Sequence, residues 1–200
     1  MRAEKTDTET RQEQIAGAAF DLIGTEGIHA LSIAGIAQRV GIVPSAVYKH
    51  YKGKDDVLEA VLNMLQGRLI ANVEASRKET RDALGRLKAI LMRHVRMLAE
   101  NRAIPHMIFS DGMYTGHPER KARVHDIMTR YLGEIQKIVQ EGQREGTIRS
   151  DVVPQTVSVM FLGMILPAAV LWSVSGGRFD VVMHAENAWP AFERGIAAEA

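Results

Sequence analysis

The sequence predicts an all-α fold of about nine helices, and two observations support this class. Apolar residues recur at intervals of three and four through most of the chain, which is the period of a helix buried on one side. Glycines, prolines and capping residues separate these segments, and no run of alternating residues argues for a sheet. The 200 residues are 46% apolar and 24% charged, as in a soluble globular protein of one large or two small domains.

The first predicted helix begins at Thr10. Thr10-x-x-Glu13 has the spacing of a capping box, and the apolar positions that follow it end near Gly24 or Gly27. The segment 1–14 is charged and lacks the apolar run of a secretory signal. We therefore expect a helical amino-terminal segment that is not a secretory signal.

The next two predicted helices are short and joined by a tight turn. Ser32 is a suitable N-cap for a helix over 33–40, and Gly41 can end it in a left-handed conformation at no steric cost. Pro44 suits the first turn of a helix that continues to about Tyr51. A rigid pair of this kind is what a DNA-binding helix-turn-helix needs, with its second helix in the major groove.

Longer helices are predicted for the rest of the chain. A stripe of apolar residues predicts a long helix from about Lys54, and similar stripes predict helices over 84–98 and 118–146. A short helix is expected at 105–111. A last helix is predicted over 180–195, where an internal proline should cause a kink or a break.

One segment, Val157–Val174, carries no charge over 18 residues, which is the lower edge of a membrane span. Its flanks hold no cluster of Lys or Arg that would orient it in a bilayer. A helix that is apolar all round equally suits a protein core or a subunit interface. We therefore expect no membrane partner.

Positive charge is concentrated in one part of a chain whose net charge is only +1. Four basic residues and no acid lie between Arg39 and Lys54, interleaved with Tyr48 and His50. A solvated basic face is the alternative, but the stretch coincides with the helix-turn-helix pattern. A second stretch, 77–102, has eight basic residues against three acids. A solvated helix face explains it best, with an anionic ligand such as an acyl-CoA as the alternative.

The segment Leu31–Leu58, LSIAGIAQRVGIVPSAVYKHYKGKDDVL, resembles the N-terminal domain of the tetracycline-repressor (TetR) family of transcriptional regulators. Four pieces fall at the family's spacing: Ile36-Ala37, Val40-Gly41, Tyr48-x-x-Tyr51 and Lys54-x-x-x-Leu58. The resemblance is strong over about residues 10–60, and beyond them it rests on the number, order and length of the helices. Val43 stands where the family usually has a polar cap, and Tyr51 replaces the usual Phe.

The resemblance implies both an organisation and a function. A DNA-binding domain is expected at 1–53, with the helix-turn-helix at about 33–51, followed by a larger ligand-binding and dimerisation domain at 54–200. Family members are homodimers that bind a palindromic operator, usually block transcription, and leave the DNA when a small molecule enters the larger domain. The implied partners are double-stranded operator DNA, a second copy of the chain and an unknown, largely apolar effector, in the cytoplasm.

Carried over residue by residue, the resemblance predicts the contacts to DNA. These are Ser32, Arg39, Pro44, Ser45, Ala46, Tyr48, Lys49, His50 and Lys54. Tyr48 is expected to face outward because Val47 and Tyr51 are better placed to point inward on a 3.6-residue period. A core tyrosine is the alternative.

Two further sets of residues are expected in the larger domain. The charge-free helix has more apolar surface than one subunit would cover, which predicts a dimer interface, with the core of a single subunit as the alternative. The interface set is Val157, Met160, Phe161, Ile165, Leu171, Trp189 and Phe192. The ligand-pocket set is His94, Leu98, Met107, Tyr131, Phe161 and Met164. His94 lies on an apolar helix face, so it is either a core histidine with a hydrogen-bond partner or a polar anchor for a ligand.

Several classes of function lack their sequence signals. The chain has no cysteine, which excludes disulfides, thiolate catalysis and Cys-based zinc sites. No Gly-x-Ser-x-Gly, Walker, His-Glu-x-x-His or Gly-x-Gly-x-x-Gly motif is present, and no two of the seven histidines are four residues apart. We therefore expect no catalytic residue, no metal site, no cofactor and no enzyme. A helical small-molecule-binding protein without sequence-specific DNA function is the remaining alternative, and it leaves the acid-free stretch unexplained.

Overall fold

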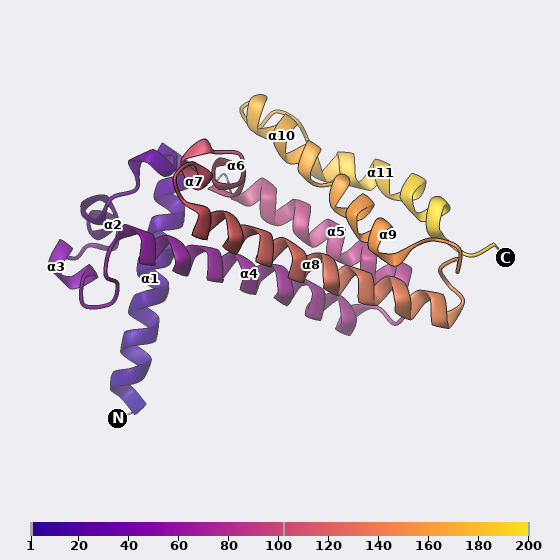
Figure 1. The fold of residues 1–200 in the computed structure, drawn as a ribbon, viewed down its shortest axis with the longest axis horizontal. Coiled ribbons are helices and arrows are strands. Elements are labelled where there is room, and N and C mark those ends of the chain that lie inside the picture. The colour runs from indigo at the N-terminus through magenta and orange to yellow at the C-terminus, as the bar shows by residue number, and fades with distance from the viewer. Residues whose placement is uncertain (1, 102, 200) are drawn as a thin grey trace. The chain divides into compact units, whose positions relative to one another are not determined.

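The structure of the protein is a computed structural model that describes residues 2–101 and 103–199, with side chains from residue 8 onward (Figure 1). Its helices are α1 (Arg2–Glu26), the 3-10 helix η1 (Ile28–Ala30), α2 (Ile33–Val40), α3 (Pro44–Val47), α4 (Lys54–Glu79), α5 (Ala83–Glu100), α6 (Ala103–Ile108), α7 (Asp111–Tyr114), α8 (Pro118–Glu145), α9 (Pro154–Gly163), α10 (Leu166–Val174) and α11 (Val181–Ile196). These described residues contain no β-strand. The predicted all-α class is confirmed, with a number of helices close to the nine expected.

The helices differ from expectation at several places. The first helix already includes Arg2, so the box at Thr10 lies inside a helix and does not begin one. The short helix expected at 105–111 is divided into α6 and α7. The charge-free segment is also divided, into α9 and α10. By contrast, Pro190 lies inside an unbroken α11, on its exposed side, where water can satisfy the carbonyl that loses its helical donor.

The chain forms two compact units. Unit 1 contains the residues up to Leu65 together with Asn101–Val124, and unit 2 contains Gln66–Glu100 and His125–Ala200. Both α4 and α8 contribute residues to each unit. The segment α6–α7 and the first turns of α8 therefore belong to the same compact unit as the helix-turn-helix segment, although about fifty residues separate them from it in the sequence.

Unit 1 has an apolar core to which α1, α2, α3 and α4 all contribute. Its fully buried side chains include Ile15, Ile23, Ile36, Val47, Val57 and Val61. The imidazole Nδ1 of His106 on α6 lies 3.2 Å from the carbonyl oxygen of Ile23 on α1. At Gly112 on α7, a β-carbon would lie only 2.5 Å from the imidazole of His29, so a larger residue there would displace this side chain of η1.

Unit 2 is built around α5 and α11, which pack side by side (Figure 1). Its buried side chains include Leu87, Ile90, Leu91, Ile135, Ile138, Phe161, Ala185 and Trp189. The ring of Phe192 contacts the rings of Phe161 and Trp189, with centroids 6.1 and 5.7 Å away. The indole Nε1 of Trp189 is buried, and it has no hydrogen-bond partner within the described part of the chain.

An ion-paired cluster, called here the Glu141 cluster, joins three helices of unit 2. Glu141 on α8 accepts two hydrogen bonds from Arg77 on α4, at 2.8 and 3.0 Å, and one from Arg86 on α5, at 3.0 Å. The pKa of Glu141 is lowered, chiefly by the hydrogen bond from Arg77. Glu79 likewise pairs with Arg93. Three arginines of the basic stretch 77–102 are therefore paired with two acids of the chain itself.

The stretch Pro154–Val174 is long and apolar enough, by length and composition, to cross a bilayer, and 39% of its most apolar part is buried inside the protein. The core helix of a soluble protein passes the same test, so a single stretch of this kind is weak evidence for a membrane span.

Candidate nucleic-acid interface

The candidate interface is built on α2, a tight turn and α3. Ser32 caps α2, because its hydroxyl oxygen accepts a hydrogen bond from the amide of Gly35 at 3.2 Å. Gly41 ends α2 with a φ of 77°, a left-handed conformation that glycine adopts without strain. The amide of Ile42 then donates to the carbonyl of Ala37 at 3.0 Å. These local interactions set the direction in which the chain enters α3, and they confirm the predicted cap and turn.

The helix α3 buries one side and exposes the other. Val47 is fully buried in unit 1, whereas Tyr48, directly after the helix, is 58% exposed. The other expected contacts on this segment are the exposed Pro44, Ser45 and Lys49 and the half-buried Ala46 and His50. The helix itself ends at Val47, with a turn after it, so it is shorter than the predicted 44–51. Tyr48 faces solvent, as its position on the helical period predicts.

The start of α3 lacks a side-chain cap. Val43 occupies the capping position and cannot accept a hydrogen bond through its side chain. Pro44 follows at the first helical position, where its missing N–H removes one of the donors that a cap would satisfy. The amide of Ala46 donates to the carbonyl of Val43 at 2.9 Å, so the first turn is closed by the backbone beside an exposed apolar side chain.

The loop between α3 and α4 is tied to its surroundings by two hydrogen bonds. The hydroxyl of Tyr51 donates to the carbonyl of Gln12 on α1 at 3.0 Å, and its ring is buried. Burial, and then the nearby charge of Asp56, raise the pKa of Tyr51. The carboxylate of Asp56 accepts from the amide of Lys52 at 3.0 Å. Tyr51 therefore points inward, as predicted, and its hydroxyl finds a backbone partner.

Three of the expected phosphate contacts have different surroundings. Arg39 already donates to Thr25 at 2.6 Å and to Glu26 at 2.9 Å on α1. Lys54 is exposed at the first position of α4. The Nδ1 atom of His50 is buried and lacks a hydrogen-bond partner among the residues described.

Sequence reasoning missed a set of polar contacts between α4 and α8 in unit 1, called here the α4–α8 ladder. Arg120 donates to Asp55 at 2.6 Å and, more weakly, to the carbonyl of Gly112 at 3.3 Å. Arg123 donates to Glu59 at 2.7 Å and also to Asn63. Asp55, Glu59 and Asn63 are four residues apart on α4, a spacing visible in the sequence, but nothing local indicates the arginines as partners.

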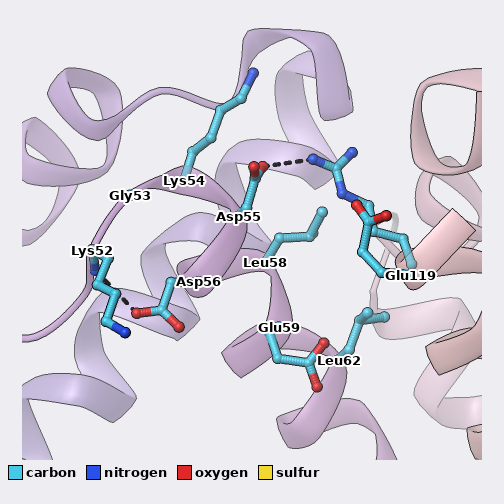
Figure 2. Close-up of a pocket in the computed structure, with 10 residues that line it drawn as sticks. Lys52, Gly53, Lys54, Asp55, Asp56, Leu58, Glu59, Leu62 and Glu119 are labelled. Carbon is cyan, nitrogen blue, oxygen red and sulfur yellow. Dashed lines mark hydrogen bonds and ion pairs between the residues drawn. The ribbon is translucent and has the colours of Figure 1, made fainter. Parts of the chain in front are cut away.

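Two pockets of about 460 and 560 Å³ lie beside the ladder. Both are lined by Lys54, Asp55, Leu58 and Arg120. Figure 2 shows the smaller pocket, with Asp55 and Asp56 pointing in opposite directions and their hydrogen bonds drawn as dashed lines. None of the six residues expected in a ligand pocket lines either of these pockets.

The expected ligand-pocket residues are mostly buried side chains of unit 2. His94 Nδ1 lies 2.9 Å from the Tyr131 hydroxyl oxygen, and the two rings meet edge to face. Burial lowers the pKa of His94 to about 4 and raises that of Tyr131, so both groups are neutral near pH 7. Leu98 and Phe161 are also buried in unit 2, Met164 is half-buried there, and Met107 is buried in unit 1.

Most of the residues expected at a dimer interface are already covered within one chain. The buried ones are Val157, Phe161, Ile165, Trp189 and Phe192. Met160 and Leu171 are exposed, together with Val159, Val170, Val174 and Met183. These six exposed side chains of α9, α10 and α11 are called here the apolar face.

Comparison with known proteins identifies a family for both parts of the chain. Residues 15–61 match the model of the bacterial regulatory proteins of the tetR family, and residues 63–193 match that of the YsiA-like protein C-terminal region. The fatty acid metabolism regulator protein of Bacillus subtilis (strain 168) is 24% identical over 169 residues, which are 84% of this chain and 87% of that protein. The nucleoid occlusion factor SlmA of Idiomarina loihiensis is 23% identical over 131 residues, 66% of this chain and 67% of SlmA.

Solved structures share the fold. FadR from Bacillus halodurans superposes with a TM-score of 0.82 at 19% identity, covering 92% of this chain and 95% of that one. FadR from Bacillus subtilis, solved in complex with stearoyl-CoA, gives a TM-score of 0.80 at 23% identity, covering 92% and 98%. With the capped α2, the glycine turn and the outward face of α3, these matches show that the chain is a transcriptional regulator that belongs to the TetR family.

Proposed function

We propose that this regulator is a repressor that binds a palindromic operator as a homodimer and that a small, largely apolar effector releases it from DNA. In this proposal residues 1–53 bind DNA, residues 54–200 bind the effector and the second subunit, and the protein has no catalytic role. Because its proposed partner is bacterial DNA, we place its action in the cytoplasm.

The observation that carries the DNA-binding role is the division of α3 into a buried and an exposed side. Val47 anchors the helix in the core of unit 1, while Tyr48 and Lys49 stand in solvent beside it. The small exposed residues Pro44 and Ser45 let the helix approach base edges in the major groove.

The remaining expected contacts fix the protein on the DNA backbone. Lys49, His50 and Lys54 would bind phosphates, and Ser32 and Arg39 would contact the backbone from α2. Ala46 would lie against bases. Arg39 would contact the DNA backbone beside Glu26, with which it already forms an ion pair.

The dimer proposal rests on the apolar face. Its six exposed side chains follow one another along α9 and α10 and continue onto α11, which is more than the scattered apolar residues of an ordinary monomer surface. A second copy of the chain would cover the same face by two-fold symmetry. Helices α9, α10 and α11 of each subunit would then form the interface.

The effector proposal rests on unit 2 and on the named relatives. Residues 63–193 match a YsiA-like C-terminal region, and the similar FadR structure holds stearoyl-CoA. The apolar interior of unit 2 suits an acyl chain, and His94 and Tyr131 are its candidate polar contacts. We therefore propose a long-chain acyl-CoA as the class of effector.

Selection of genomic fragments by the purified full chain tests the DNA-binding role. At physiological salt we expect recovery of a short palindrome, bound more tightly than random duplex of equal length. If no fragment is enriched above random DNA, the protein would instead be a helical small-molecule-binding protein without sequence-specific DNA function.

Substitution of Tyr48 tests the recognition face. Tyr48→Ala should weaken binding to the selected fragment by more than about tenfold, since it removes an outward contact and leaves the core intact. Phe109→Ala is the matched control, because Phe109 is another exposed aromatic residue of unit 1, directly after α6 and outside the helix-turn-helix segment. Fluorescence anisotropy measures both affinities, and equal losses in the two variants would reject the assignment.

Substitution of Met160 tests the interface. Met160→Glu places a charge on the exposed apolar face and should give monomers in light scattering. Phe161→Glu would be a poor test, because Phe161 is fully buried in its own subunit. Phe109→Glu serves as the control for an added exposed charge, and a Met160→Glu protein that remains dimeric would move the interface elsewhere.

Stearoyl-CoA tests the effector class. Added to the complex of protein and selected fragment, it should raise the apparent dissociation constant for DNA, whereas coenzyme A without an acyl chain should not. Release by both compounds, or by neither, would contradict the proposed acyl-chain recognition.

A further inference from the structure

Arg120 connects three elements of unit 1. From α8 its guanidinium donates to Asp55 on α4 at 2.6 Å and reaches the carbonyl of Gly112 on α7 at 3.3 Å. The Arg120 side chain is only 11% exposed, while that of Asp55 is 67% exposed. The arginine is therefore the enclosed partner, and Asp55 comes to it from the surface of α4.

Asp55 lies in the first turn of α4, directly after the loop that follows α3. Its neighbour Asp56 holds the amide of Lys52, in the loop between α3 and α4. Figure 2 shows the two carboxylates pointing in opposite directions. The first turn of α4 is thus attached to α8 by Asp55 and to the loop after α3 by Asp56.

Two pockets lie beside the Asp55–Arg120 ion pair, so few side chains pack against it. The pockets of about 460 and 560 Å³ share Asp55 and Arg120 in their linings, so both pockets border the ion pair. An element beside empty space lacks the close packing that fixes position in a core. The buried Val57 fixes the inner side of the first turn of α4, and the polar contacts of Asp55 and Asp56 hold its outer side.

We propose that Arg120 is a positioning residue for DNA reading. Through Asp55 it holds the first turn of α4, and through the loop after α3 it sets the orientation at which Tyr48 and Lys49 meet the operator. Arg120 itself does not touch DNA. This inference rests on the proposed DNA-binding function.

A double-mutant cycle tests the inference on the full chain. The variants are Asp55→Asn, Arg120→Gln and both together, and the probes are the fragment selected by the wild type and a random duplex of equal length. Each single variant should lower the ratio of specific to random affinity by about fivefold. The double variant should lose no more than either single one, because the same contact is removed once. Asp55→Asn and Arg120→Gln change the net charge in opposite directions, which alters the affinity for any DNA. The ratio of specific to random affinity removes this common contribution.

Two measurements separate positioning from other roles. The salt slope of specific binding should match the wild type in Arg120→Gln, since a phosphate contact would lower it by about one. Hydrogen exchange without DNA should be faster at the amides of 45–58 in Arg120→Gln. Lys121→Gln is the matched control, because it removes one positive charge from an exposed neighbour on α8, and both readouts should be unchanged.

The outcomes are distinguishable. An unchanged affinity ratio in Arg120→Gln, additive losses in the double variant, or a reduced salt slope would each overturn the inference. If the wild type does not discriminate between the two duplexes, the proposed function fails, and the exchange measurement still decides whether Arg120 holds α3 and α4. Should Arg120→Gln fail to fold, Asp55→Asn carries the test, since it changes an exposed side chain.

Discussion

The helices α4 and α8 exchange ion pairs in both units, but with their roles reversed. In the α4–α8 ladder of unit 1, α4 supplies the acids and α8 the arginines, and the acids Asp55 and Glu59 are 67% and 45% exposed. In the Glu141 cluster of unit 2, α8 supplies the acid, which is 23% exposed and accepts from two arginines. Water screens the first set far more than the second. We therefore expect the Glu141 cluster to contribute more to the free energy of unfolding than the α4–α8 ladder, whose ion pairs hold the first turns of α4 and α8 together only weakly.

The His94–Tyr131 pair is more deeply buried than either set of ion pairs, and we expect it to have the largest effect on the free energy of unfolding. Burial lowers the pKa of His94 from 6.5 to about 4, so between these values the unfolded chain binds a proton that the folded chain does not. The free energy of unfolding should therefore fall as pH falls through this window, by about 3 kcal/mol in total. Urea unfolding at several pH values measures it.

The matching variant is His94→Gln, which cannot titrate and should lose this share of the pH dependence. His125→Gln, at an exposed histidine of α8, should keep the wild-type dependence. If wild type and His94→Gln show equal slopes between pH 6.5 and 4, then His94 does not enter the folded core as a neutral ring.

The Glu141 cluster should have the next largest effect on the free energy of unfolding. Glu141→Gln keeps the shape but removes the charge that two arginines share, and it should cost about 2 kcal/mol at pH 7. Because the pKa of Glu141 is lowered in the folded state, this contribution is present above the ordinary carboxyl range and disappears as pH falls through the folded value. Urea unfolding of Asp151→Asn, at an exposed acid that pairs with the exposed Arg149, should show a much smaller cost.

The ladder should give the smallest effect on stability. Asp55→Asn and Glu59→Gln should each change the free energy of unfolding by about 0.5 kcal/mol or less, because exposed ion pairs contribute little. Urea unfolding beside Glu141→Gln makes the comparison direct. A cost equal to that of Glu141→Gln would mean that the ladder is a structural support like the cluster, and the contrast between the two units would be lost.

Local features of the fold could be predicted where they depend on residues close to one another in the sequence. The cap at Ser32, the turn at Gly41 and the inward Val47 and Tyr51 follow from residues within a few positions of one another, and each is confirmed. The all-α class follows from the same short-range periodicity. Local signals were wrong at Thr10, where a capping box lies inside a longer helix. At Pro190 the helix is not broken, because an exposed helix face tolerates the missing donor.

Long-range partners could not be predicted in this way. Arg120 pairs with a residue 65 positions away, and Arg77 with one 64 positions away, so no window of sequence contains both members. The burial of Phe161 and Trp189 within one chain has the same origin, since a helix that is apolar all round does not reveal which side its own subunit covers. The DNA contacts and the effector pocket remain predictions.

The indole Nε1 of Trp189, buried and without a hydrogen-bond partner among the described residues, makes unit 2 distinguishable from unit 1 by fluorescence. The chain has two tryptophans, Trp172 and Trp189, and both belong to unit 2. An indole held in an apolar interior without a hydrogen bond emits at shorter wavelength than one in water, so Trp189 should dominate the blue side of the emission spectrum. Tryptophan fluorescence therefore follows unit 2, the part of the chain that we propose binds the effector, while tyrosine signals are needed to follow α3 in unit 1.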